Sequence, residues 1–318
     1  MNLAKILLLR ETAALRPGLA CEITPTGVVA GRRGKGDQEM FVSYAPLHPR
    51  VFSIGLKPPN FIDAAAVSSA IRRAVDEVRE RETKLTVVIP DTAVRVLLLD
   101  FDSLPPKTAE SLAIIKFRLR KLVPFETEDA AVSYQPISSK DGMVRTIVAV
   151  SPGPVVAEYE SAVRAAGYEP GVVLPSTLAA LAALSVEEPS LVVNRNVHSV
   201  TTAITRNDQL LLYRTLELVE PDGDDGSLRE ESMTPFERRQ AAEELQQSVS
   251  VAIAYFEDTL STPPRQLLAC GPGGAEELIH LLGDSAIPAY DLVPTPATAN
   301  TKSLPLGVFA GVRGALAS

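Results

Sequence analysis

Three short stretches of the sequence hold residue types that could bind a phosphate group. Residues 24–27 read Thr-Pro-Thr-Gly, residues 31–37 are polar and glycine-rich, and residues 271–274 read Gly-Pro-Gly-Gly. Backbone N–H groups in such turns can cradle phosphate, because a glycine lets the ligand approach the main chain closely. The 31–37 stretch lacks the P-loop spacing, since two residues separate its first two glycines and a glycine follows its lysine. We expect a hairpin turn there and keep the other two stretches as candidate ligand turns.

Cysteine and histidine are too few and too scattered to suggest a metal centre or a nucleophile–base pair. The chain holds Cys21, Cys270, His48, His198 and His280, none with metal-site spacing. Neither the G-x-S-x-G elbow nor the H-E-x-x-H motif is present. These observations disfavour a hydrolase or a metalloenzyme. We expect both cysteines to be buried thiols of a protein from a reducing compartment.

The overall composition is that of a globular protein. Of 318 residues, 46% are apolar and 22% charged, and the net charge of −8 argues against a general nucleic-acid binder, which needs a basic face. The apolar run 6–9 is too short for a signal peptide. The longest apolar stretch, 172–186, is broken by Pro175 and falls short of the ~20 residues that span a bilayer. The sequence therefore predicts a soluble, cytoplasmic protein.

The elements that would position the candidate turns occur in two similar series. The first half predicts strands at 19–23 and 28–32, a helix at 64–82, strands at 85–89 and 93–101, a helix at 105–122, strands at 130–137 and 143–150, a helix at 154–166, a strand at 171–174 and a helix at 176–185. The second half predicts strands at 190–194, 199–205 and 209–216, a helix at 235–260, a strand at 266–270, a helix at 275–282, a strand at 288–293 and a last helix at 304–317. Since each half opens with a β-hairpin, we predict an internally duplicated α/β fold.

The helix predicted at 105–122 separates apolar from basic positions. Leu112, Ile115, Leu119 and Leu122 are expected to share one face, and Lys116, Arg118, Arg120 and Lys121 another. Two interpretations of the basic side stay open: a surface for a partner or anionic lipid, or an ordinary solvated helix face.

Three stretches resemble the type IV pilus assembly protein PilM, a member of the actin-like superfamily. Residues 87–125, with a Pro-Asp turn, "FDSLP" and "LVPF", are similar to an inserted subdomain of that family. Residues 159–181 are similar to its helix, glycine stop, strand and next helix. The third stretch joins the glycine turn within 267–278 to the last helix at 304–316. The order of elements covers nearly the whole chain.

The resemblance also lets the family's nucleotide motifs be laid on this chain. The first phosphate loop would fall on residues 21–29, where Glu22 replaces an aspartate, Thr24 a glycine and Val29 a lysine, and where Pro25 has no N–H to donate. The second falls on residues 194–196, Asn-Arg-Asn, which have lost the carboxylate and the glycine.

Only the third motif, at 271–274, keeps its glycines. The resemblance therefore implies a degenerate nucleotide cleft formed by Thr24, Thr26, Gly271, Gly273 and Gly274. No cofactor is expected, with ATP and Mg²⁺ as the alternative. Arg195 is expected to be an exposed loop arginine.

The fold implied is α/β: an actin-like (ribonuclease H-like) duplicated two-lobe fold with an inserted αβ subdomain. We expect the first lobe at 1–82 and 152–188, the inserted subdomain at 83–151 and the second lobe at 189–318.

The function implied is a cytoplasmic scaffold at the inner face of the inner membrane, a protein that does not hydrolyse ATP. It would bind the N-terminal tail of a PilN-like inner-membrane protein in a groove near 87–125 and 159–178, with Lys116, Arg118, Arg120 and Lys121 as candidate contacts. Other pilus assembly subunits are possible further partners, nucleic acid is not, and the membrane would be met only through partners.

Three alternatives stay open. An active actin-like ATPase would use a rebuilt site with Glu22 and Glu243 or Glu244 as carboxylates. A cell-division actin homologue is disfavoured because the last helix carries few cations near its end. A secretion-system relative of PilM is expected to continue into a membrane span, which this sequence does not show.

Overall fold

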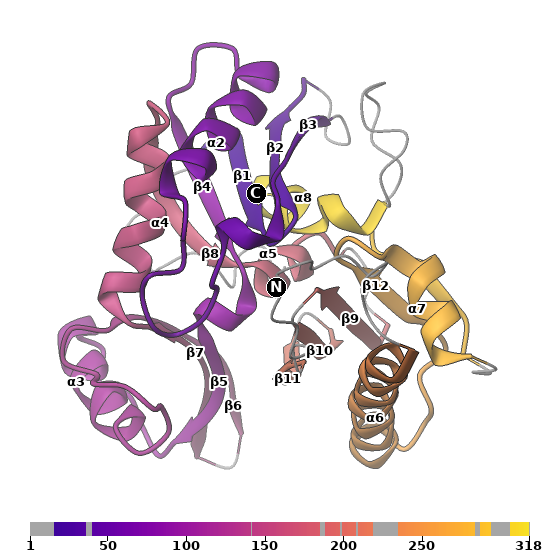
Figure 1. The fold of residues 1–318 in the computed structure, drawn as a ribbon. Coiled ribbons are helices and arrows are strands. Elements are labelled where there is room, and N and C mark those ends of the chain that lie inside the picture. The colour runs from indigo at the N-terminus through magenta and orange to yellow at the C-terminus, as the bar shows by residue number, and fades with distance from the viewer. Residues whose placement is uncertain are drawn as a thin grey trace.

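The computed structural model describes residues 16–35, 40–140, 142–184, 188–197, 199–207, 209–218, 235–283, 287–293 and 306–317. Two five-stranded sheets form two lobes, and a small three-stranded sheet projects from the first lobe (Figure 1).

The first sheet has the strand order β3-β2-β1-β4-β8. Its strands are β1 (Leu19–Thr24), β2 (Gly27–Arg33), β3 (Met40–Pro46), β4 (Lys84–Ile89) and β8 (Glu169–Pro175). β1, β2 and β3 pair antiparallel as a meander, while β4 runs parallel to β1 and β8 parallel to β4. The parallel pairs need crossover connections, and helices provide them.

Helices cover both faces of this sheet, which explains why every residue of β1 is buried. Successive side chains of a strand point to opposite faces. Leu19, Cys21 and Ile23 pack into the core beneath α2 (Ala64–Val78) and α4 (Gly153–Ala165). Ala20 packs on the other face with Val312 of α8 (Ala310–Leu316), beside α5 (Ser176–Leu181). Glu22 shares that second face.

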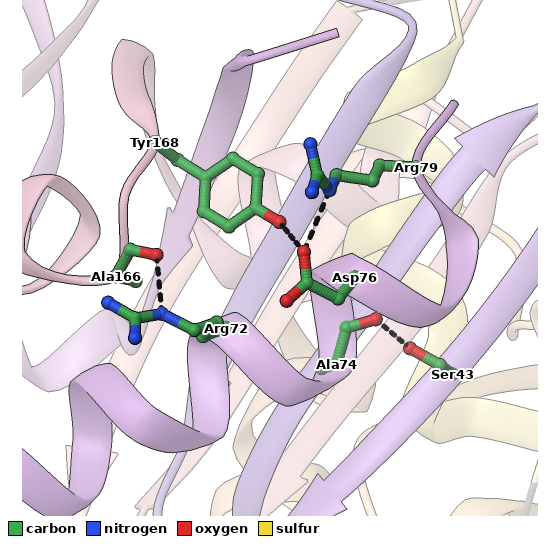
Figure 2. Close-up of polar contacts among 7 residues, drawn as sticks. All are labelled: Ser43, Arg72, Ala74, Asp76, Arg79, Ala166 and Tyr168. Carbon is green, nitrogen blue, oxygen red and sulfur yellow. Dashed lines mark hydrogen bonds and ion pairs between the residues drawn. The ribbon is translucent and has the colours of Figure 1, made fainter. Parts of the chain in front are cut away.

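Polar contacts fix α2 to its neighbours (Figure 2). Ser43 of β3 donates to the Ala74 carbonyl, and Arg72 donates through Nε to the Ala166 carbonyl at 3.0 Å. Asp76 accepts hydrogen bonds from Tyr168 (2.5 Å) and from Arg79 (2.7 Å). The bond from Tyr168 is the main reason why the pKa of Asp76 is lowered. These contacts join β3, α2 and the end of α4 into one unit.

The second sheet repeats the first. Its order is β11-β10-β9-β12-β13, with β9 (Ser190–Asn196), β10 (Ser199–Arg206), β11 (Gln209–Glu217), β12 (Leu267–Cys270) and β13 (Ala289–Asp291). Again three strands form an antiparallel meander, and two further strands run parallel to the first. α6 (Pro235–Leu260) and α7 (Gly274–Leu282) carry Leu245, Phe256 and Leu278 into its core. The predicted duplication is confirmed.

The small sheet lies between β4 and β8 in the chain. It contains β5 (Arg95–Phe101), β6 (Ala131–Lys140) and β7 (Met143–Ser151) in the order β5-β7-β6, and α3 (Thr108–Leu119) packs on one face through Ile115 and Leu119. β4 pairs with β1 and β8, so residues 84–89 belong to the first lobe. The small sheet begins at β5, one strand after the expected boundary at 83.

Some element bounds differ from the predicted ones for identifiable reasons. α2 ends at Val78 instead of 82, because residues 79–82 are charged and offer no apolar side chain to the core. α3 ends at Leu119 instead of 122, and Leu122 is 47% exposed instead of buried. Pro124 disfavours helical backbone at the residue before it. β3 was not predicted. Among the described residues, no helix is long and apolar enough to cross a bilayer.

Candidate functional site

The first candidate turn is closed by its own side chains. Thr24 Oγ1 donates to the Gly27 carbonyl at 2.9 Å and accepts the Thr26 N–H at 3.3 Å. Gly27 has a φ of +155°, and a Cβ there would lie 2.5 Å from the Ala45 carbonyl oxygen. The lack of a side chain at Gly27 therefore allows β3 to pack closely against the turn. The hydroxyls of Thr24 and Thr26 also contact each other at 3.2 Å, so both take part in holding the turn.

Residues 194–196 at the end of β9, where the second nucleotide motif falls, pack directly on the glycine turn at 271–274. A Cβ on Gly271, which has a φ of +92°, would lie 2.0 Å from the Arg195 carbonyl oxygen. The Gly271 N–H donates to the Gly307 carbonyl at 3.0 Å, and the Gly274 N–H donates to the Gly271 carbonyl at 3.2 Å. These two N–H groups of the glycine turn donate to carbonyls of the protein itself. The glycine at 271 allows the turn to pack closely on Arg195.

Arg195 lies across this turn. It pairs with Glu277 of α7, and the side chains are 19% and 23% exposed. The Glu277 carboxylate also occupies the space that a Cβ on Gly273 would need. The expectation of an exposed loop arginine was wrong, because the fold brings α7 over β9 and supplies a carboxylate that the local sequence does not reveal.

The cavity that the described residues form at this contact between the lobes is too small for a nucleotide. The cavity has a volume of about 10 Å³ and is lined by both lobes, including Glu22, Asn194 and Gly271. One water molecule needs roughly this much room, whereas ligand pockets usually measure about 300 Å³ or more. The residues present therefore do not fit ATP with Mg²⁺ in this structure.

Glu22 is buried beside this cavity. Its Oε1 accepts a hydrogen bond from Ser176 at 2.6 Å, while Oε2 lies near the backbone of Val312 with no hydrogen bond of normal geometry. A Cβ on Gly311 would lie 2.3 Å from Oε2, so α8 closes over the carboxyl. Burial raises the pKa of Glu22 to about 7, against the hydrogen bond from Ser176. A carboxyl that tends to stay neutral is a poor ligand for Mg²⁺.

The most heavily bonded side chain of this region is Asp91, in the turn after β4. It is 2% exposed and accepts hydrogen bonds from the Thr177 N–H (3.0 Å), Tyr213 (2.8 Å), Thr201 (3.0 Å), the Thr177 hydroxyl and Asn194. Tyr213, Thr201 and Asn194 belong to the second lobe, so Asp91 ties the two lobes together. Burial raises its pKa, and the hydrogen bonds from Thr177, Tyr213 and Thr201 oppose that rise.

The sequence analysis missed this role. It treated residues 90–92 only as a turn between strands, although an aspartate placed directly after a buried strand was a signal for a polar function at the end of that strand. The donors to Asp91 come from α5, β9, β10 and β11. The tertiary fold brings these donors together around Asp91, and no short sequence pattern indicates that they meet.

The four predicted partner-binding cations do not form one face. Lys116 donates to the Glu128 carbonyl at 2.7 Å and Arg120 pairs with the Glu128 carboxylate. Arg118 instead donates to the Asp100 carbonyl at 3.1 Å, and Lys121 lines the same groove as Arg118. The candidate carboxylates of the ATPase alternative lie on α6: Glu243 is exposed, and Glu244 accepts a bond from Gln240 within that helix.

No family model matches the sequence, and no curated protein matches it. Among solved structures, a chain of a PilM–PilN type IV pilus biogenesis complex superposes with a TM-score of 0.74, covering 94% of this chain and 97% of that chain at 19% identity. This chain has an actin-like fold like that of PilM. The cytoplasmic domain of EpsL, an inner-membrane component of the type II secretion system of Vibrio cholerae, gives a TM-score of 0.52, covering 94% of each chain at 11% identity.

The PilM-like fold confirms the resemblance drawn from residues 87–125, 159–181 and the C-terminal stretches. The superposition covers both the duplicated sheets and the small sheet between β4 and β8, since it spans 94% of this chain. At these identities the comparison establishes the shared fold, and the function has to be argued from the surfaces of this chain.

Proposed function

We propose that this chain is a cytoplasmic scaffold of a type IV pilus assembly machine, held at the inner face of the inner membrane by binding the N-terminal tail of a PilN-like protein. The observation that carries the proposal is the superposition, over nearly the whole length of both chains, on a chain of a PilM–PilN complex. Other pilus assembly subunits would then meet the scaffold on its remaining surfaces.

The scaffold would work without hydrolysing ATP. The closed cavity, the Arg195–Glu277 pair and the hydroxyls used inside the first turn support this part of the proposal. Mg²⁺-dependent phosphate release that is abolished in Glu22→Ala would contradict it.

The tail would bind between the first lobe and the inserted subdomain. β8 is the terminal strand of the first sheet, so within the described part of the chain one of its edges has no neighbouring strand. Val172 on this strand is 40% exposed. An extended tail would add to this edge through main-chain hydrogen bonds, with side-chain pockets giving selectivity.

Pull-down on an immobilised PilN-like tail tests this placement. Wild-type chain should be retained, and Val172→Glu should lower the affinity about tenfold or more by placing a charge at the contact. Val197→Glu is the matched control, since Val197 is 38% exposed in the β9–β10 turn. Absence of wild-type retention, or equal loss in both variants, would refute the placement.

A further inference from the structure

The outer face of α3 bears an apolar groove. It has a volume of about 410 Å³ and is lined by Phe101, Ile114, Phe117, Arg118, Lys121 and Leu122. Phe117 is 67% exposed, Leu122 47% and Ile114 41%. Scattered apolar side chains on a surface are ordinary, but a contiguous group around a hollow is typical of a binding surface. Phe101 is buried and forms the floor.

The charge at this groove has one sign. Its two charged lining residues, Arg118 and Lys121, are both cationic, and none of the described residues that line it carries a carboxylate. Arg118 is held in place, because Nη1 donates to the Asp100 carbonyl at 3.1 Å and the guanidinium lies 5.4 Å from the centre of the Phe101 ring. Neither cation makes an ion pair within the described residues, whereas Arg120 is paired with Glu128.

The groove lies on the small sheet's helix, whereas the β8 edge proposed for the tail belongs to the first sheet. α3 covers one face of the small sheet, with Ile115 and Leu119 pointing inward to that sheet. Figure 1 shows α3 at the outer margin of the molecule, remote from α6 and α7. The exposed side of α3 and the β8 edge therefore belong to different sheets, and the proposal made here for Arg118 and Lys121 differs from their expected contact with the tail.

We propose that the α3 groove docks an acidic amphipathic helix of a partner protein. A large apolar side chain of that helix would enter the groove between Ile114, Phe117 and Leu122, and its carboxylates would meet Arg118 and Lys121. Helix-in-groove recognition uses apolar anchors on one face of the bound helix. Charge complementarity at the rim selects the partner and its orientation.

An anionic bilayer fits these observations less well. The groove is concave, and Arg118 is fixed at its wall by the Asp100 carbonyl instead of extending outward. The net charge of −8 also disfavours long-range attraction of the whole chain to an anionic membrane.

Fluorescence anisotropy with a designed probe tests the proposal on the full chain. The probe is a labelled helix-forming peptide of about 18 residues, long enough to hold some helix in water, with Leu and Phe on one face and Glu on its flanks. A second peptide carries Lys in place of every Glu. Sedimentation with phosphatidylserine-rich vesicles forms the other arm.

The acidic peptide should bind and the basic peptide should bind about tenfold or more weaker. Phe117→Ala and Lys121→Glu should each weaken the acidic peptide about tenfold or more. The controls Ile62→Ala, a 66% exposed side chain elsewhere, and Arg73→Glu, an exposed cation on α2, should change its affinity by less than about twofold.

Three results would overturn the proposal. The first is equal or absent binding of the two peptides to the wild-type chain. The second is binding of the acidic peptide that Phe117→Ala and Lys121→Glu leave unchanged. The third is sedimentation with the vesicles that Phe117→Ala abolishes while the acidic peptide does not bind, which would assign the groove to a membrane surface.

Discussion

Glu22 and Asp91 are both buried where the lobes meet, and their surroundings differ. Glu22 accepts one hydrogen bond from Ser176 and leaves its other oxygen without a partner. Asp91 accepts hydrogen bonds on both oxygens from three elements of the second lobe and from α5. A buried carboxylate is stabilised by such donors and destabilised by their lack. Removing the charge should therefore affect the stability of the folded protein in opposite ways at the two positions.

Glu22 should make the protein less stable as the pH rises. Its folded pKa of about 7 lies above the ordinary value of 4.5, so the folded state holds the proton more tightly. The stabilisation is complete below the unfolded pKa and is lost as the pH rises through about 7. Urea unfolding of wild type and Glu22→Gln at pH 5 and pH 8 should show wild type losing about 2.5 kcal/mol relative to the variant. The same pH dependence in both proteins would refute this assignment.

Asp91→Asn should destabilise the protein strongly, although it changes few atoms. The amide places N–H donors where Thr177, Thr201 and Tyr213 already point donors. We expect a loss of about 3 kcal/mol, the range for breaking a buried hydrogen-bonded charge. Tyr213→Phe removes one donor and should cost about 1 kcal/mol. Denaturant titration measures both, and a smaller cost for Asp91→Asn than for Tyr213→Phe would contradict the account.

At the scale of elements, α8 packs closely between the first sheet and α5. Glycines on α8 and on β2 allow this close approach. A Cβ on Gly314 would lie 1.7 Å from the Ala179 carbonyl oxygen, and a Cβ on Gly31 of β2 would lie 2.3 Å from Val312. The Ala179 carbonyl is a backbone group that cannot yield without moving α5, whereas the Gly31 contact is with the Val312 side chain. Gly314 therefore fixes the position of α8 against α5.

Gly314→Ala should therefore cost stability even though alanine favours helices. We expect a loss of about 2 kcal/mol from overpacking, read as a lower urea midpoint. Gly55→Ala is the matched control, because nothing lies within 4 Å of the added Cβ, and it should be neutral or slightly stabilising. Equal stability of the two variants would show that α8 can shift.

The order of the elements was predictable because hydrophobic periodicity is local. The hairpin of β1 and β2 and the duplicated series could both be derived from short windows. Contacts between distant elements could not. The pairing of Arg195 with Glu277, the exposure of Leu122 and the convergence on Asp91 depend on which elements the fold brings together.

At the scale of the whole molecule, buried polar contacts and an ion pair hold the two lobes together. Asp91 links the first lobe to β9, β10 and β11, and Arg95 of the small sheet pairs with Glu217 of β11 at 3.0 Å. The cavity lined by Glu22, Asn194 and Gly271 at this contact between the lobes has a volume of about 10 Å³. We infer that function has moved to outer surfaces, the β8 edge and the α3 groove.

Calorimetric titration of the chain with a PilN-like N-terminal tail peptide, with and without millimolar ATP and Mg²⁺, tests this account most directly. A scaffold with a closed cleft predicts measurable tail binding with the same affinity in both conditions. Absence of tail binding, or an affinity that changes when ATP and Mg²⁺ are added, would contradict it.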